Sequence, residues 1–249
     1  MTRRAFLGVC AVASTGAVLG SMPATLDPSR DPRFAHTWSM AMDIDRCIGC
    51  GRCVAACRAE NDVPVTRYRT WIERYVIMDD GRVLVDSPNG GEFGFPEIAE
   101  PELVRRAFHV PKMCNHCDAS ACTQVCPVGA TFDAPDGVTL VDPLYCVGCS
   151  YCVQACPYGC RFVNPETEVA DKCTLCYHRI DRGLRPACVE ACPTGTRIFG
   201  DMRELEGDIA EAKYPDYVEF MRSRGVQVLK PHLGTRPKVF YSNLDQEVR

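Results

Sequence analysis

Residues 146–157 read CVGCSYCVQACP, in which four cysteines are spaced as C-x2-C-x2-C-x3-C. This spacing is typical of the loop that wraps a cubane [4Fe–4S] cluster in bacterial ferredoxins. Three thiolates reach one cluster from a single tight loop, and the fourth lies on the following helix and faces a neighbouring cluster. Residues 47–57, CIGCGRCVAAC, repeat the same spacing. The pattern predicts an iron–sulfur protein of the two-cluster ferredoxin type.

Two further quartets bring the total to sixteen of the eighteen cysteines. The second quartet has four residues between its second and third cysteines, and the fourth quartet has eleven. Proline, which ends a helix, follows the last cysteine of every quartet except the first, where Arg58 stands. Sixteen thiolates at four per cluster predict four [4Fe–4S] clusters. The predicted iron ligands are Cys47, Cys50, Cys53, Cys57, Cys114, Cys117, Cys122, Cys126, Cys146, Cys149, Cys152, Cys156, Cys173, Cys176, Cys188 and Cys192.

Zinc and disulfide bonds are the alternatives for cysteines this close in sequence. Structural zinc uses two Cys-x2-Cys pairs per ion or histidine partners, rather than quartets that end in x3-Cys-Pro. The run C-x2-C-x2-C crowds its cysteines too tightly for separate, unstrained disulfide bonds. A zinc protein would also be colourless and contain no acid-labile sulfide. The sequence therefore favours iron–sulfur clusters.

The segments around the quartets predict the fold. Residues 128–142 indicate a short β-hairpin with its turn at Asp136-Gly137, and a cysteine loop and helix follow it. This order of elements is the repeat of a two-cluster ferredoxin. We expect an α+β fold with two bacterial-ferredoxin-like two-cluster units of short strands, cysteine loops and short helices. Because the apolar core of such a chain is modest, the clusters must supply much of its stability.

Three regions follow along the chain. Residues 1–35 are predicted to be a signal and linker, and residues 36–200 to be the four-cluster core. Within that core, residues 61–113 contain no cysteine and form an insertion, with strands expected at 70–77 and 82–85. Residues 201–249 are predicted to be a C-terminal helix, from about Arg203 to Arg222, and an extended partner-docking tail from Val226 to Tyr241.

The N-terminus indicates export. Arg3-Arg4 and the following Phe6-Leu7 open a weakly apolar run that ends near Met22, as in a twin-arginine signal. The twin-arginine pathway carries folded cargo, which suits clusters that are built in the cytoplasm. The run is marginal in length and apolar character for a membrane span. No clean small-x-small cleavage site is present near Ala24, so an uncleaved membrane anchor is the alternative to a cleaved signal. The expected location is periplasmic, with membrane contact beyond residue 30 made through a partner.

The charges and histidines exclude other functions. The formal net charge is −4 and no basic stripe is present, so the sequence gives no support for nucleic-acid binding. His116 and His178 lie beside complete quartets and are expected to be hydrogen-bonding neighbours rather than catalytic bases. Arg52 and Lys172, next to cysteines, either raise cluster potentials electrostatically or are solvated charges with little effect. No catalytic residues are predicted, which favours a non-catalytic electron-transfer subunit.

Three stretches carry a resemblance to a known family: CPYG at 156–159, ADKC at 170–173 and ACVEACPTG at 187–195. With the four cysteine runs, they resemble the four-cluster electron-transfer subunits of the dimethyl sulfoxide reductase/polysulfide reductase group. The exported branch is most similar, as in the iron–sulfur subunits of formate-dependent nitrite reductase, tetrathionate reductase and membrane complexes linked to sulfite reduction. The resemblance covers nearly all of the sequence from Met42 to about Gly200.

Spacing alone leaves open whether the third quartet pairs with the second or with the fourth. The family pairs the inner two quartets and the outer two. For this sequence the resemblance implies four ligand sets: Cys47, Cys50, Cys53 with Cys192; Cys173, Cys176, Cys188 with Cys57; Cys114, Cys117, Cys122 with Cys156; and Cys146, Cys149, Cys152 with Cys126.

The resemblance implies an electron-transfer subunit of an anaerobic respiratory complex. Its partners would be a polytopic quinone-interacting membrane subunit and either a molybdopterin enzyme or a multihaem c-type cytochrome. The alternative is a freely diffusing periplasmic ferredoxin-like carrier, against which the insertion and the tail argue, since a shuttle needs little beyond its clusters. A self-sufficient reductase would need a substrate site that no motif supplies.

Overall fold

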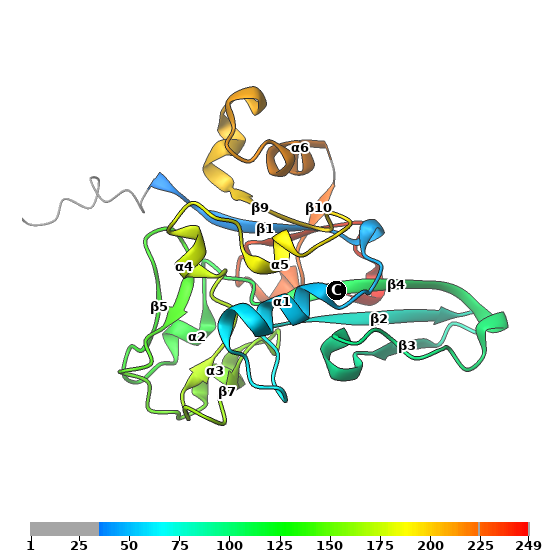
Figure 1. The fold of residues 1–249 in the computed structure, drawn as a ribbon, viewed down its shortest axis with the longest axis horizontal. Coiled ribbons are helices and arrows are strands. Elements are labelled where there is room, and N and C mark those ends of the chain that lie inside the picture. Colours follow the sequence, from blue (N-terminus) through cyan, green and yellow to red (C-terminus); the bar gives the residue numbers. More distant parts are fainter. Residues whose placement is uncertain (1–34, 224, 249) are drawn as a thin grey trace, which may run out of the picture.

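The computed structural model describes residues 35–223 and 225–248, which form four small sheets joined by short helices (Figure 1). The predicted signal in residues 1–35 lies outside them except for residue 35. The strands are β1 (Trp38–Asp43), β2 (Thr70–Met78), β3 (Val83–Asp86), β4 (Val104–Met113), β5 (Thr131–Asp133), β6 (Thr139–Val141), β7 (Phe162–Val163), β8 (Ala170–Asp171), β9 (Arg197–Asp201), β10 (Val226–Gln227) and β11 (Val239–Ser242). The α-helices are α1 (Arg52–Asn61), α2 (Ala121–Gln124), α3 (Tyr151–Ala155), α4 (Tyr177–Ile180), α5 (Ala187–Glu190) and α6 (Pro215–Ser223). Short helices and small sheets confirm the predicted α+β class.

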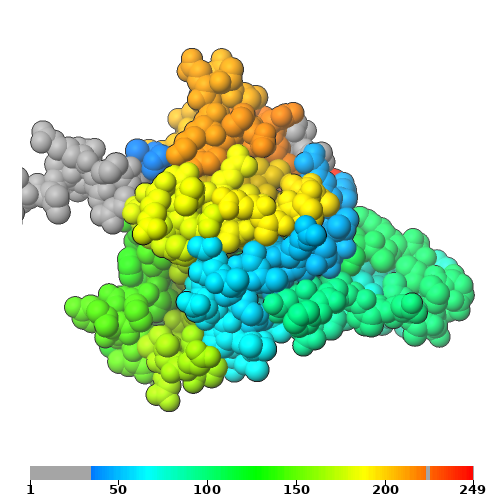
Figure 2. Space-filling view, viewed as in Figure 1, coloured from blue at the N-terminus to red at the C-terminus, as the bar shows by residue number. Residues whose placement is uncertain are grey.

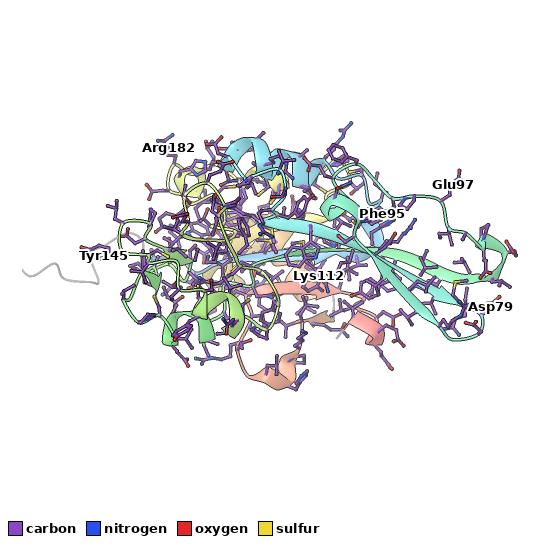
Figure 3. All side chains as sticks on the ribbon, turned by 90° about the horizontal axis from the view of Figure 1, so that it is seen from below. Asp79, Phe95, Glu97, Lys112, Tyr145 and Arg182 are labelled. Atoms are coloured by element: carbon purple, nitrogen blue, oxygen red, sulfur yellow. The ribbon has the colours of Figure 1, made fainter. Side chains whose placement is uncertain are left out.

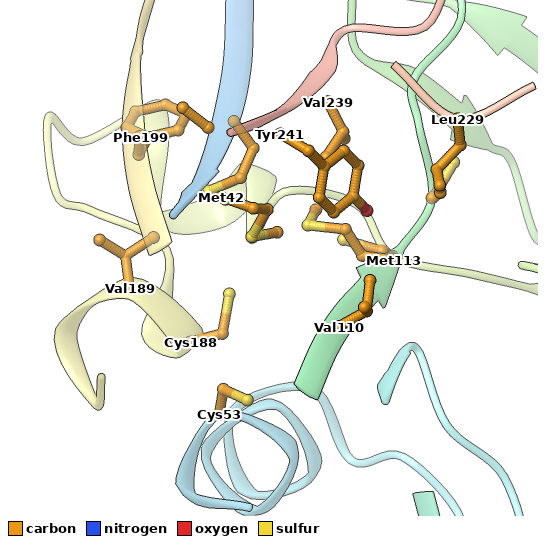
Figure 4. Close-up of a cluster of buried hydrophobic side chains, with 14 of the residues drawn as sticks. Met42, Cys53, Val110, Met113, Cys188, Val189, Phe199, Leu229, Val239 and Tyr241 are labelled. Atoms are coloured by element: carbon orange, nitrogen blue, oxygen red, sulfur yellow. The ribbon is translucent and has the colours of Figure 1, made fainter. Parts of the chain in front are cut away.

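The largest sheet has the order β10-β11-β1-β9 and holds the core. Strand β1 is central, pairing parallel with β11 and antiparallel with β9. All six of its residues are buried because both faces of the sheet are covered. Figure 4 shows Met42 and Tyr241 from this sheet in the same buried cluster as Cys53 and Cys188, which come from α1 and α5. Cysteine helices and sheet thus share one core.

The insertion forms the sheet β3-β2-β4, which projects from the rest of the molecule (Figure 2). The strands expected at 70–77 and 82–85 are confirmed as β2 and β3, paired antiparallel. Strand β4 was not predicted from the sequence. It lies at the sheet edge, where Pro111 opposite Ile72 is tolerated because an edge position leaves the missing N–H unused. Arg105, Arg106 and Pro111 interrupt the alternation of apolar and polar residues by which a strand is predicted from sequence.

The hairpin predicted between the second and third quartets is confirmed. Strands β5 and β6 pair antiparallel, with Thr131 opposite Val141. The turn is closed by a hydrogen bond from the Ala134 N–H to the Val138 carbonyl at 2.8 Å. Gly137 in this turn has φ of 81°, a backbone conformation that favours glycine. This hairpin lies beside α2, in the part of the molecule that carries the inner quartets (Figure 1).

The long helix predicted from Arg203 to Arg222 is wrong in its first half. Two 3-10 turns, η6 (Met202–Glu206) and η7 (Ile209–Glu211), precede α6, which begins only at Pro215. Proline is tolerated in the first turn of a helix but breaks a helix when it lies in the interior. The side chains of Asp201 and Asp208 accept hydrogen bonds from the backbone N–H groups two residues on, which stabilises short turns in place of a helix.

The segment predicted to be extended from Val226 to Tyr241 contains β10, the 3-10 turn η8 (Pro231–Leu233) and β11. Val239 of β11 pairs with Met40 of β1, and Tyr241 is fully buried. This part of the tail therefore completes the core sheet. Its predicted role in partner docking stays a prediction.

Packing of α6 on β9 leads to a stability prediction. A Cβ at Gly200 would lie 2.1 Å from the ring of Tyr217, which is fully buried and accepts a hydrogen bond from Ser39 Oγ at 2.5 Å. We expect Gly200→Ala to lower the free energy of unfolding of the holoprotein by about 1–3 kcal/mol, the usual cost of overpacking. Anaerobic denaturant titration measures this change. Gly207→Ala is the matched control, since its nearest neighbour is 3.8 Å away. Equal midpoints for the two variants would contradict the prediction.

Candidate metal centres

The loops of the first and third quartets have the same backbone shape. Gly49 and Gly148, which stand between the first two cysteines of each loop, have φ of 68° and 66°. Gly51 and Ser150, one residue past the second cysteine, have φ of 74° and 65°. A Cβ at Gly49 or Gly148 would lie 2.5 Å from the nearest neighbouring atom, so glycine is needed there for space as well as for conformation. Equal spacing has produced equal loops.

Each cysteine loop leads into a short helix, and α1 is the longest of them in the described part of the cysteine-bearing core. Helix α3 ends at Ala155, just before Cys156-Pro157, whereas α1 runs past Cys57 to Asn61. The residue after Cys57 is Arg58 rather than proline, so the helix continues for one further turn. Arg58 forms an ion pair with Glu92 at 2.6 Å, and this contact ties α1 to the insertion.

One cavity brings together cysteines from the two ends of the core. It is lined by Cys47, Cys50 and Cys53 of the first quartet and by Cys192 of the fourth. These residues are about 140 positions apart in sequence and meet because β1 pairs antiparallel with β9, which brings the chain after β1 next to the chain before β9.

A second cavity is lined by the remaining cysteines of these two quartets. Cys57 of the first quartet lies there with three cysteines of the fourth, Cys173, Cys176 and Cys188. The amide of Asn61, in the extra turn of α1, donates to the sulfur atoms of Cys57 at 3.7 Å and Cys176 at 3.6 Å. Each of the two cavities is lined by four cysteines from the first and fourth quartets, which suits one cluster in each. The structure thus brings together the outer ligand sets that the family resemblance implies.

The second and third quartets also bring their cysteines together. Burial raises the pKa of Cys117 to about 12, with the nearby Cys114, Cys122 and Cys156 acting in the same direction against a hydrogen bond that lowers it. Burial likewise raises the pKa of Cys122 to about 11, with Cys114 and Cys156 again among its charged neighbours. Cys156 of the third quartet therefore lies among three cysteines of the second.

For the remaining four cysteines the structure gives the surroundings. Cys152 is buried, Cys149 is exposed, and Cys126 and Cys146 are half-buried. Backbone N–H groups donate to two of the sulfur atoms, from Thr131 to Cys126 at 3.5 Å and from Ala170 to Cys146 at 3.3 Å. Such donors lower the charge density on cluster ligands. The assignment of all sixteen cysteines as iron ligands stays a prediction.

The donor set fits an iron–sulfur cluster. Burial raises the pKa of Cys57 well above its usual value, and the neighbouring charges of Cys173, Cys188 and Cys176 raise it further. Four thiols this close cannot all ionise in a buried site unless cations compensate them. Iron supplies that charge, and thiolates are the ligands that iron–sulfur clusters require.

Comparison with known proteins is consistent with this chemistry. Residues 46–130 and residues 105–202 each match a 4Fe-4S dicluster domain. Over 98% of the chain, the sequence is 39% identical to a subunit of tetrathionate reductase from Salmonella typhimurium, of which it covers 89%. The chain belongs to the four-cluster iron–sulfur subunits of the dimethyl sulfoxide reductase/polysulfide reductase group. It is an electron-transfer subunit, and its dicluster domains bind four [4Fe–4S] clusters in total.

Two other relatives of this iron–sulfur subunit match over nearly the whole chain. It is 37% identical to protein NrfC of Escherichia coli, over 96% of the chain and 94% of that protein. It is 31% identical to the Hdr-like menaquinol oxidoreductase iron–sulfur subunit 1 of Archaeoglobus fulgidus, over 99% of the chain and 100% of that protein. The sequence-based family, fold class, cofactor and electron-transfer function are confirmed.

Sequence reasoning missed two functional candidates in this iron–sulfur subunit, Arg161 and Arg197. Both side chains are buried among the cysteines. The signal that would have found them is the repeat Cys-Pro-x-Gly-x-Arg, which occurs at 156–161 and at 192–197. By contrast, Arg52 is exposed, and the ammonium of the buried Lys172 donates to the backbone carbonyls of Thr139 and Cys173.

Proposed function

We propose that this subunit relays electrons through its four clusters between a quinone-reacting membrane subunit and a catalytic or cytochrome partner of an anaerobic respiratory complex. One observation carries the proposal. Of the seventeen cysteines in the described part of the chain, only Cys50 and Cys149 are exposed. In the ligand sets that the family resemblance implies, these two cysteines belong to different two-cluster units. A relay needs one cluster near the surface where electrons enter and another where they leave.

The surface around each exposed cysteine supports contact with a partner. Ile48, beside Cys50, is largely exposed. Around Cys149 lies an apolar patch, which we define as Leu144, Tyr145, Val147 and Tyr151, and Leu144 is 91% exposed. Tyr145 lies at the opposite end of the molecule from Asp79 in the projecting insertion (Figure 3). Exposed apolar groups that cluster in this way are typical of interaction sites.

The units of the relay are assigned by the pairing that the family resemblance implies, and the two cavities that hold the outer quartets support this assignment. The first unit takes its ligands from the quartets at 47–57 and 173–192, and the second from those at 114–126 and 146–156. In this assignment Cys50 belongs to the first unit and Cys149 to the second. The subunit itself is non-catalytic, and the chemistry on the terminal substrate takes place in a molybdopterin enzyme or a multihaem c-type cytochrome.

The proposed location is periplasmic, after export by the twin-arginine pathway. Arg3-Arg4 supports this proposal. In residues 35–223 and 225–248, no helix has the length and apolar character that a membrane crossing requires. Attachment to the membrane would then depend on the quinone-reacting partner, or on the N-terminal segment if it is retained.

Size measurement on native membranes tests the relay against a free carrier. We expect gel filtration of detergent-solubilised membranes to elute the subunit together with larger partners, because a relay works only while docked. The same fractions should show cluster reduction by added menaquinol. A subunit that elutes alone near 27.6 kDa, from membranes extracted without loss of other complexes, would favour the freely diffusing carrier.

A further inference from the structure

Two arginines occupy equivalent positions in the two units. The third quartet ends in Cys-Pro-Tyr-Gly-Cys-Arg at 156–161, and the fourth ends in Cys-Pro-Thr-Gly-Thr-Arg at 192–197. In the first and second quartets the same position holds Asp62 and Thr131. Each unit combines two quartets, so each unit has one such arginine. Arg161 is 5% exposed and Arg197 is 2% exposed.

Arg197 lies between the two cavities of the first unit. It lines the cavity that holds Cys192. Its Nη2 donates to Thr70 Oγ1 at 2.7 Å, and its Nη1 lies 3.7 Å from Met113 Sδ. Thr70 and Met113 both line the other cavity, the one that holds Cys57. The guanidinium therefore forms part of the wall that separates two proposed cluster sites.

Arg161 has the corresponding place in the second unit. Its Nη2 donates to the sulfur of Cys122 at 2.9 Å, and its Nη1 donates to Thr131 Oγ1 at 3.2 Å. Burial lowers the pKa of this guanidinium, but the negative charges of Cys122, Cys114 and Cys152 raise it overall. Cys122 and Cys114 are proposed ligands of one inner cluster, and Cys152 is a proposed ligand of the other.

In the described part of the chain, neither arginine is paired with a carboxylate. Among residues 35–223 and 225–248, the ion pairs between side chains include neither Arg161 nor Arg197. A buried guanidinium is strongly unfavourable unless a negative group lies close to it. For Arg197 those groups are thiolates from both cavities, Cys53, Cys188 and Cys47, whose charges outweigh the effect of burial and raise its pKa. The partner of each arginine is thus the cysteine environment of two clusters.

We propose that Arg161 and Arg197 are equivalent inter-cluster cations, each of which raises the reduction potentials of both clusters in its unit. Reduction adds one electron to a cluster and breaks no bond, so the cluster becomes more negative by one charge. A fixed positive charge in a buried, weakly screened wall favours the reduced form. The inference rests on the proposed ligand sets, and the arginines are positioning residues that tune potentials without carrying electrons.

The test uses Arg197→Gln and Arg161→Gln in the full holoprotein. Anaerobic redox titration followed by electron paramagnetic resonance gives the potential of each cluster. For Arg197→Gln we expect the reduced-to-oxidised ratio of two clusters to fall about tenfold at a given solution potential, a shift of about 59 mV for a one-electron couple. The other two clusters should be unchanged. Arg161→Gln should shift the complementary pair, so each variant contains its own internal reference.

Arg52→Gln is the matched control for loss of a charge near a ligand. Arg52 lies directly before Cys53, but its side chain is exposed, so solvent and salt screen its charge. We expect a much smaller shift than in either buried variant. Arg197→Lys and Arg161→Lys keep the charge and should hold wild-type potentials.

The outcomes separate charge from packing. Glutamine variants with about sixteen irons and unshifted potentials, or with equal shifts in all four clusters, would overturn the proposal. If a glutamine variant assembles fewer clusters, the lysine variant at the same position shows whether the charge or the packing of the side chain is responsible. Full iron with wild-type potentials supports the inter-cluster charge, whereas lost iron or altered potentials in the lysine variant overturn it. A subunit that elutes alone from solubilised membranes would overturn the relay while leaving these potentials as measured.

Discussion

Removal of iron from the holoprotein should unfold most of the four-cluster core. Buried cysteines, among them Cys53, Cys114 and Cys188, belong to the same core cluster as the apolar side chains of β1 and β11. Without iron, the cysteines would surround empty cavities, and Arg161 and Arg197 would lose the anions that compensate them. Metal binding in such a site is folding free energy. We expect this change to have the largest effect on stability of any described here.

Anaerobic chelation followed by hydrogen exchange and circular dichroism measures the effect. We expect amide protection in α1 and α5 to be lost together with the visible absorbance of the clusters. Reconstitution with iron and sulfide is the control, and it should restore both signals. Protection of these helices that survives complete iron removal would show that the apolar core alone holds the fold.

Loss of single ligands should reveal that clusters are shared between distant quartets. We expect Cys192→Ala to remove the one cluster whose cavity also holds Cys47, Cys50 and Cys53. Iron should fall from about sixteen to about twelve per chain. Cys160→Ala is the matched control, because Cys160 is buried and close to the second unit but completes no quartet. It should retain about sixteen irons.

Double variants show which cysteines share a cluster. If Cys47 and Cys192 hold the same cluster, Cys47→Ala combined with Cys192→Ala should still contain about twelve irons. Cys173→Ala combined with Cys192→Ala should contain about eight, because two clusters are then affected. The opposite pattern, about eight for the first pair and about twelve for the second, would show that each quartet binds its own cluster.

Much of this architecture could be predicted from the sequence because its signals are local. Cysteine spacing fixes the loop shape, as the matching backbone angles of Gly49 and Gly148 show. The hairpin at β5 and β6 is encoded by a turn and two short strands. By contrast, the pairing of β1 with β11 joins residues about 200 positions apart and leaves no periodic signal in either strand. The predicted tail helix is too long at its N-terminal end. Two aspartate-capped 3-10 turns replace its first half, and the α-helix begins only at Pro215.

For the metal centres, the sequence supplied the cysteines but not what lies between them. Arg161 and Arg197 are single charged residues, and charged residues are usually solvated. Their repeat becomes visible only when the quartets are superimposed on one another, and their burial depends on strands that pair over long distances. Asn61 was missed for a related reason, since the extra turn of α1 that positions it follows from a residue other than proline after Cys57.

The pairing of β1 with both β9 and β11 also sets an order of assembly during synthesis. All proposed ligands of the second unit lie between residues 114 and 156, so they leave the ribosome close together and can meet early. The first unit needs residues near 40, near 200 and near 240 in one sheet. We therefore expect it to remain open until nearly the whole described chain has been translated, and its two clusters to be enclosed only when β11 pairs with β1.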